Sequence, residues 1–139
     1  MKLPLHLAEK LDHESRRTLD KQACDRILTC EGDLHEEIRG ILNRRGIVYF
    51  ESRMDKRTTQ RKGVPDFIFS VAVTSVDGKT EAVLSTAVPQ AWECKFGYKK
   101  LTPEQAGTFA AMSRFPNCWR TVEIRSVSQA LQELSSLGL

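Results

Sequence analysis

The spacing of hydrophobic and polar positions divides the chain into helical and extended segments. Apolar residues at positions 7, 11, 19, 23 and 27 recur at loosely helical intervals among many charges, which predicts a weakly amphipathic helix over 7–28. A firmer helix is predicted from Asp33, which forms a capping-box pattern with Glu36, to Gly46, which can adopt the left-handed conformation that ends helices. Its expected apolar face consists of Leu34, Ile38, Ile41 and Leu42.

The middle of the chain has the composition of β-strands. Runs rich in β-branched and aromatic residues predict strands at 47–52, 66–74 and 91–96. Asp77-Gly78 is a turn signal after the second of these runs. The following stretch up to Gln90 is apolar but irregular, and its Pro89 favours a bend or a sheet edge.

The C-terminal third returns to helix. Thr102-Pro103-Glu104-Gln105 places a threonine at the N-cap, a proline at the first helical position and a glutamine at the third, which predicts a helix to about Arg114. A strand at 119–125 and a closing helix at 128–137 follow. The order α, α, β, β, β, α, β, α predicts a single α/β domain with a central mixed sheet.

Composition narrows the class of protein. The 139 residues are 40% hydrophobic and 28% charged, which is typical of one globular domain and leaves little room for two catalytic domains. We expect a cytoplasmic protein, or one in the host cytoplasm if it is viral, and not a secreted one. The start lacks a signal peptide, no run reaches the roughly 20 apolar residues of a membrane span, and the four cysteines lack CxxC spacing. The three histidines, His6, His13 and His35, have no ligand-like spacing and are expected at the surface.

The charge is distributed unevenly. Residues 38–62 contain eight basic and two acidic residues, whereas residues 63–95 contain two basic and four acidic residues. The run from Glu51 to Lys62 alone has a net charge of +3, equal to that of the whole chain. A polyanion-binding surface beside a metal site would give this distribution, and so would a solvated charged face.

Two short motifs contain candidate catalytic residues. Gly63-Val64-Pro65-Asp66 is followed 27 positions after its aspartate by Glu93-Cys94-Lys95. Alternation along a strand directs Glu93 and Lys95 to one face and their neighbours to the other. With Asp66 alongside, the two carboxylates would suit Mg²⁺. The ion and the Lys95 ammonium together would suit phosphodiester hydrolysis. A surface ion pair beside an ordinary turn is the alternative, and the combination of motifs disfavours it.

These motifs resemble the PD-(D/E)xK nuclease superfamily, and within it the virus-type replication-repair nuclease (VRR-NUC) family. The resemblance covers about residues 33–127 and also includes Glu37 on the helix and Leu101-Thr102-Pro103-Glu104-Gln105. It implies a restriction-endonuclease-like core, with residues 1–32 as an N-terminal helical extension and residues 33–139 as the nuclease domain. The stretch between Asp66 and Glu93 is long for the family and leaves room for an extra hairpin.

The resemblance also implies roles for individual residues. Asp66 and Glu93 would bind Mg²⁺, for which Mn²⁺ could substitute, and the backbone carbonyl of Cys94 would reach the same ion. Lys95 would orient or activate the attacking water. No small-molecule cofactor is expected.

Two further residues, Glu37 and Gln105, each have two alternative roles. Glu37 would add a metal-binding carboxylate, because it borders the face that packs on the sheet, whereas Glu36 should point to solvent. Its alternative role is that of an ordinary carboxylate in the first helical turn. Gln105 would serve either in catalysis or only as part of the helix cap.

The predicted function is a Mg²⁺-dependent, structure-selective DNA endonuclease acting on branches such as four-way (Holliday) junctions or flaps, and the resemblance implies a homodimer. No helix has the residues for reading bases, so DNA shape is the expected target. A nuclease of the same fold for plain duplex DNA or RNA, and a catalytically silent binding module, remain alternatives. The intact Asp66, Glu93 and Lys95 count against the silent module. The expected phosphate-binding residues are Arg53, Lys56, Arg57, Arg61, Lys62, Lys99 and Lys100.

Overall fold

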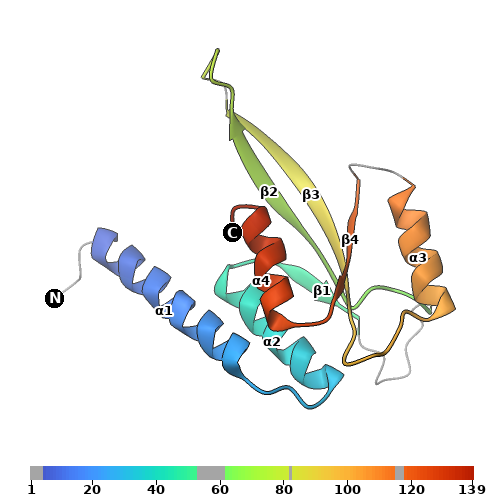
Figure 1. Ribbon diagram of the computed structural model, residues 1–139. Helices are drawn as coiled ribbons and strands as arrows, with labels where there is room; N and C mark the ends of the chain where they lie inside the picture. The colour runs from blue at the N-terminus through green and yellow to red at the C-terminus, as the bar shows by residue number, and fades with distance from the viewer. Residues whose placement is uncertain (1–4, 53–61, 82, 115–117) are drawn as a thin grey trace.

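The computed structural model describes residues 5–52, 62–81, 83–114 and 118–139. The described segments form helices and strands in the predicted order (Figure 1). These are α1 (Leu5–Asp25), α2 (Glu31–Arg44), β1 (Tyr49–Glu51), β2 (Phe67–Val76), β3 (Val83–Cys94), α3 (Pro103–Ser113), β4 (Arg120–Ile124) and α4 (Val127–Ser136).

The strands form one mixed sheet in the order β1-β2-β3-β4. The β1–β2 and β2–β3 pairs are antiparallel, and β3 and β4 are parallel. Helices α1, α2 and α4 lie on one side of this sheet and α3 lies on the other (Figure 1). The predicted single α/β domain with a central mixed sheet is confirmed, and the architecture is consistent with a restriction-endonuclease-like core.

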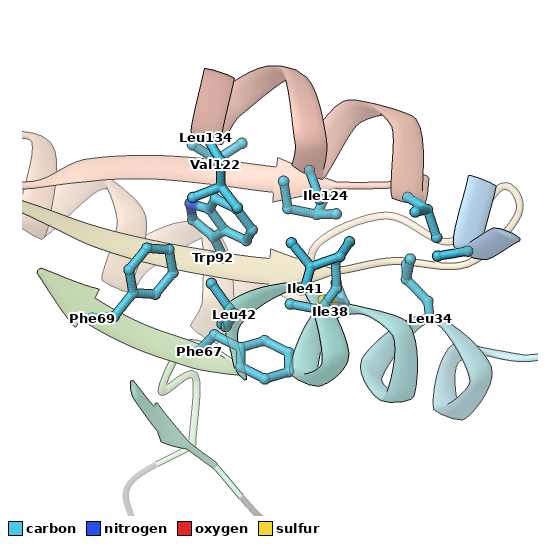
Figure 2. Close-up of a cluster of buried hydrophobic side chains, with 14 of the residues drawn as sticks. Leu34, Ile38, Ile41, Leu42, Phe67, Phe69, Trp92, Val122, Ile124 and Leu134 are labelled. Atoms are coloured by element: carbon cyan, nitrogen blue, oxygen red, sulfur yellow. The ribbon is translucent and has the colours of Figure 1, made fainter. Parts of the chain in front are cut away.

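The hydrophobic core lies between the sheet and the helices α2 and α4 (Figure 2). The predicted apolar face of α2 is fully buried there, and Phe69 and Trp92 of the sheet pack edge to face with ring centroids 4.9 Å apart. Ala23 of α1 joins the same core, so the end of the N-terminal helix is anchored to the domain. The core residues from α2 are Leu34, Ile38, Ile41 and Leu42.

Helix α2 begins earlier than its sequence suggests. Its N-cap is Cys30, which makes no side-chain capping bond, and the predicted capping box of Asp33 with Glu36 is wrong. The Asp33 carboxylate instead accepts hydrogen bonds from the backbone nitrogen and the hydroxyl of Thr29, at 2.9 and 2.8 Å. The first helical turn therefore contains Glu31, and the expected boundary between residues 32 and 33 falls inside the helix.

Strands β2 and β3 form one long hairpin whose outer half projects beyond the rest of the sheet (Figure 1). The predicted turn is present, since the Asp77 carboxylate accepts a hydrogen bond from the backbone nitrogen of Lys79 at 2.9 Å. Of the bend or sheet edge predicted at Pro89, the structure has the edge, because β3 runs through Pro89 without a break but has no β4 partner there. Pairing with β4 starts only at Gln90, so Pro89 stands where its missing N–H costs no bond to β4.

Gly63 brings the segment that leads into β2 close to α3. Its φ is +88°, and a Cβ at this position would lie 2.6 Å from the backbone oxygen of Glu104 and 2.9 Å from the hydroxyl of Thr108. Only glycine combines that backbone conformation with so close an approach. The glycine of the Gly63-Val64-Pro65-Asp66 motif therefore sets the distance between Asp66 and α3.

We predict that Gly63→Ala destabilises the fold more than Gly46→Ala does. Gly46 also has a positive φ, +65°, but a Cβ there would meet no atom of the described structure within 4 Å. An alanine held at positive φ lowers the free energy of unfolding by about 1–2 kcal/mol at either position. At Gly63 alone, the contact of the new Cβ with α3 lowers it by about 1–3 kcal/mol more. Urea denaturation of the two variants measures the difference, and equal losses would show that α3 does not press on Gly63.

Candidate active site

A cavity of about 650 Å³ opens where β1 ends, β2 begins and β3 ends. The first turns of α2 and the start of α3 complete its walls. It brings together four of the predicted site residues, Asp66, Glu93, Lys95 and Gln105, from three separate segments. The residues lining it are Glu31, Gly32, His35, Arg39, Glu51, Ser52, Asp66, Glu93, Lys95 and Gln105.

The pairing of β2 with β3 places the two predicted carboxylates side by side. Phe67 is opposite Trp92, so Asp66, one residue before β2, faces Glu93 across the strands. The Asp66 Oδ2 atom accepts a hydrogen bond from the backbone nitrogen of Cys94 at 2.9 Å. This bond fixes the Asp66 carboxylate at the end of β3.

Glu93 and Lys95 extend into the cavity from the same face of β3, as alternation predicts. Their Oε1 and Nζ atoms are 3.9 Å apart, while Trp92 and Cys94 are buried in the core on the other face. Glu93 is 2% exposed and Lys95 is 7% exposed, so this is no surface ion pair. A buried carboxylate and ammonium are costly to maintain, which favours a functional origin for the pair.

Gln105 caps α3 as predicted and also contacts Glu93, while its role in catalysis remains a prediction. Its backbone nitrogen donates to the Thr102 hydroxyl at 3.2 Å, and its Oε1 accepts from the Thr102 backbone nitrogen at 2.9 Å, which completes the predicted capping box. Its Nε2 then donates to Glu93 Oε1 at 2.6 Å. The cap of α3 and the orientation of Glu93 are therefore coupled through one side chain.

The two carboxylates repel each other inside the protein. Burial, followed by the charge and hydrogen bonding of Asp66, raises the pKa of Glu93 to about 8, and the nearby Lys95 only partly opposes this. Glu93 Oε2 is buried and has no hydrogen-bond partner among the described residues. The position of Glu93 thus favours a proton or a cation on that oxygen.

His35 lies in this site and not at the surface. Its Nδ1 is 3.4 Å from Glu51 Oε1, and its Nε2 is 3.3 Å from Asp66 Oδ2. Burial acts to lower the pKa of His35, but the neighbouring carboxylates of Asp66 and Glu51 outweigh that effect and the net shift is upward. A lone histidine gave no motif to detect, although Glu31, His35 and Arg39 do repeat every four residues along one helix flank.

The structure does not bring Glu37 into the site. Its carboxylate pairs with Arg26, Oε1 to Nη1 at 2.8 Å, and it does not line the cavity. At about 100° per residue, Glu37 is about 160° around the helix from His35, on the opposite flank of the buried stripe. Glu31, on the same flank as His35, supplies the helix carboxylate of the cavity instead.

Cys94 contributes its backbone N–H to the site, and the proposed contact of its carbonyl with a metal remains a prediction. Its thiol is buried, and burial together with Asp66 and Glu93 raises the pKa of that thiol. The Cys94 sulfur therefore stays protonated at neutral pH. Ligand atoms of His35, Asp66 and Cys94 nevertheless lie within 4.8 Å of one another.

The described basic residues lie close in sequence to residues that line the cavity. Lys62 immediately precedes Gly63, and Lys99 and Lys100 lie between Lys95 and the cap of α3; all three lysines are exposed. Four further predicted phosphate-binding residues lie outside the described residues: Arg53, Lys56, Arg57 and Arg61.

The donor set fits a divalent cation. Asp66, Glu93 and Glu31 offer carboxylate oxygens around one cavity, and the buried, unpartnered Glu93 Oε2 is an oxygen for which a cation would provide a partner. These carboxylates could hold the ion. Lys95 would then balance the remaining negative charge.

In comparisons with known proteins, no family model and no curated protein matches the chain. Among solved structures, the chain is similar to the MspJI restriction endonuclease in complex with a 27-mer oligonucleotide, with 21% sequence identity and a TM-score of 0.31. The match covers 90% of this chain and 27% of that one, so the chain spans about a quarter of that enzyme. At so low a TM-score this likeness supports no inference about activity. Within the described residues, no helix is both long enough and apolar enough to cross a membrane.

We predict that Glu93→Gln stabilises the metal-free protein at alkaline pH. The glutamate titrates near its ordinary pKa of 4.5 when unfolded and at about 8 when folded, so the folded state retains a proton in between. Stability of the unmodified chain therefore falls as the pH rises from about 4.5 to about 8, and the amide removes that loss.

Thermal denaturation in EDTA at pH 5 and pH 8.5 measures the effect. At each pH, the melting temperature of Glu93→Gln is compared with that of the unmodified chain. The gain should be larger at pH 8.5 than at pH 5 by at least about 4 °C, which corresponds to about 1 kcal/mol in the free energy of unfolding. Glu14→Gln, at an exposed position on α1, should show no such change. The same difference at both pH values for Glu93→Gln would contradict a raised pKa.

Proposed function

We propose that this chain is a divalent-metal-dependent nuclease of the PD-(D/E)xK type, similar to the VRR-NUC family, that hydrolyses phosphodiester bonds in DNA. One observation carries the proposal. Asp66, Glu93 and Lys95 converge in one cavity, and a buried oxygen of Glu93 has no hydrogen-bond partner among the described residues. A purely structural cluster would gain little from two adjacent carboxylates, one of them buried, beside a buried ammonium.

Each residue has a distinct role in the proposed reaction. A divalent cation, when bound, would neutralise the scissile phosphate and lower the pKa of water. Asp66 and Glu93 hold the ion, with Glu31 as a further carboxylate. Lys95, 3.9 Å from Glu93, orients the attacking water and offsets the charge that develops on the phosphate. Gln105 holds Glu93 in its orientation from α3.

The proposed substrate is branched DNA. Exposed lysines beside the cavity, Lys62, Lys99 and Lys100, suit contacts with phosphates, which provide affinity without reading the sequence. In a homodimer, two cavities related by a two-fold axis would make the paired cuts that a four-way junction requires. Mg²⁺ or Mn²⁺ is the proposed cofactor, and DNA the partner.

The first test is cleavage of a four-way junction, a flap, plain duplex, single-stranded DNA and RNA in Mg²⁺, Mn²⁺ or EDTA. We expect metal-dependent cutting, fastest on the branched substrates. Asp66→Asn and Lys95→Ala should each lower the rate by about 10²–10³-fold, because each removes a charge from the reacting centre.

Lys79→Ala is the matched control for Lys95→Ala, since Lys79 is an exposed lysine at the hairpin turn, away from the cavity. Its rate should equal that of the unmodified protein. Cutting in EDTA, or full activity in Lys95→Ala, would refute the mechanism. Binding without cutting under every condition would favour the silent module, and equal cutting of plain duplex would remove only the preference for branches.

A separate measurement tests the phosphate contacts. We expect the double variant Lys99→Ala, Lys100→Ala to bind DNA more weakly in EDTA and to lower the slope of log K against log salt concentration by about 1–2, since each lost phosphate contact contributes about 0.9. Fluorescence anisotropy over a range of salt concentrations gives the slope. An unchanged slope would mean that these two lysines do not touch the backbone.

A further inference from the structure

The imidazole of His35 is held between two carboxylates that belong to different strands. Glu51 at the end of β1 lies beside Nδ1, at 3.4 Å, and Asp66 at the start of β2 lies beside Nε2, at 3.3 Å. The His35 ring also packs against Phe67, with ring centroids 5.4 Å apart. Its position is therefore set on three sides.

The two ring nitrogens of His35 differ in their hydrogen bonding. Glu51 is itself fixed by Arg39, whose Nη1 donates to Glu51 Oε1 at 2.7 Å, so Glu51 is a stable acceptor for an N–H at Nδ1. That arrangement leaves the lone pair on Nε2, which is buried and has no hydrogen-bond partner in the described part of the chain. A histidine that donates one N–H to a carboxylate and keeps the other nitrogen free is the usual arrangement of a metal-binding histidine.

The free nitrogen also points to the proposed metal site. In octahedral coordination with bonds of about 2.1 Å, neighbouring ligand atoms lie about 3 Å apart. His35 Nε2 and Asp66 Oδ2 are 3.3 Å apart, close to that spacing. Glu93, which faces Asp66 across the strands, has another buried atom without a hydrogen-bond partner in the same cavity, as does Ser52, among the described residues.

We propose that His35 Nε2 is a ligand of the divalent cation, alongside carboxylate oxygens of Asp66 and Glu93, and that the site binds Mn²⁺ in preference to Mg²⁺. This inference rests on the proposed function, because it concerns the same site. Mg²⁺ favours oxygen ligands and water, whereas imidazole nitrogen is a better ligand for transition-metal ions. One nitrogen among the oxygen ligands therefore shifts the preference toward Mn²⁺.

Pulsed electron paramagnetic resonance of Mn²⁺ bound to the full chain tests this directly. We expect a ¹⁴N coupling from a coordinated imidazole, which His35→Gln abolishes and the exposed control His13→Gln retains. Calorimetry should show that His35→Gln weakens Mn²⁺ binding by at least about tenfold, with a smaller effect on Mg²⁺. Growth with ¹⁵N-histidine should convert the coupling to that of ¹⁵N in the unmutated protein, which keeps the test valid if the variant fails to fold.

The outcomes separate this inference from the proposed function. Bound Mn²⁺ without nitrogen coupling, in a protein that still cuts DNA, would make His35 only an ion-pair partner of Asp66 and would overturn the inference alone. Nitrogen coupling in a protein that cuts no DNA or RNA would support the ligand and overturn the nuclease. No Mn²⁺ binding at millimolar concentration would overturn the metal site, and both proposals with it.

Discussion

The hydrogen bond from the backbone of Cys94 to the Asp66 carboxylate is the contact on which the site depends. It joins the residue before β2 to the last residue of β3, and the pairing of these two strands puts Asp66 opposite Glu93. A one-residue slip would send Glu93 into the core and Trp92 into the cavity, because side chains alternate along a strand. The buried aromatic packing of Trp92 against Phe69 therefore protects the arrangement of the charged residues.

The charged cluster is stabilised by contacts from several of the elements that line the cavity. Lys95, the residue that follows β3, and Gln105 of α3 both approach Glu93 Oε1, while His35 of α2 approaches Asp66. Among the described residues that line the cavity, buried atoms of Glu93, His35 and Ser52 still have no hydrogen-bond partner. Such unpaired atoms destabilise a fold unless something binds them, and they are more informative about function than the satisfied contacts are.

The sequence predicts the parts of this site that depend on local rules. Strand alternation is a local property, and it was enough to place Glu93 and Lys95 on one face. The helical period showed that Glu37 borders the buried stripe of α2, but a stripe has two flanks and the period does not say which one faces the site. That choice depends on how α2 lies on the sheet, which brings His35 to Asp66 and turns Glu37 toward Arg26. The start of α2 was missed for a related reason, since Cys30 caps it without the side-chain bond that a sequence pattern can predict.

The Gly63-Val64-Pro65-Asp66 motif and the Thr102-Pro103-Glu104-Gln105 motif meet at the start of α3, which explains why they occur together. Gly63 allows the segment before β2 to touch the backbone of α3 at Glu104, and the adjacent residue Gln105 reaches Glu93. A side chain at Gly63 would push the start of α3 outward, and the hydrogen bond of 2.6 Å between Gln105 and Glu93 would lengthen with it. The conformational freedom of one glycine thus controls the orientation of a carboxylate on a different strand. The spacing of the whole motif set follows from this packing as much as from the chemistry of the individual residues.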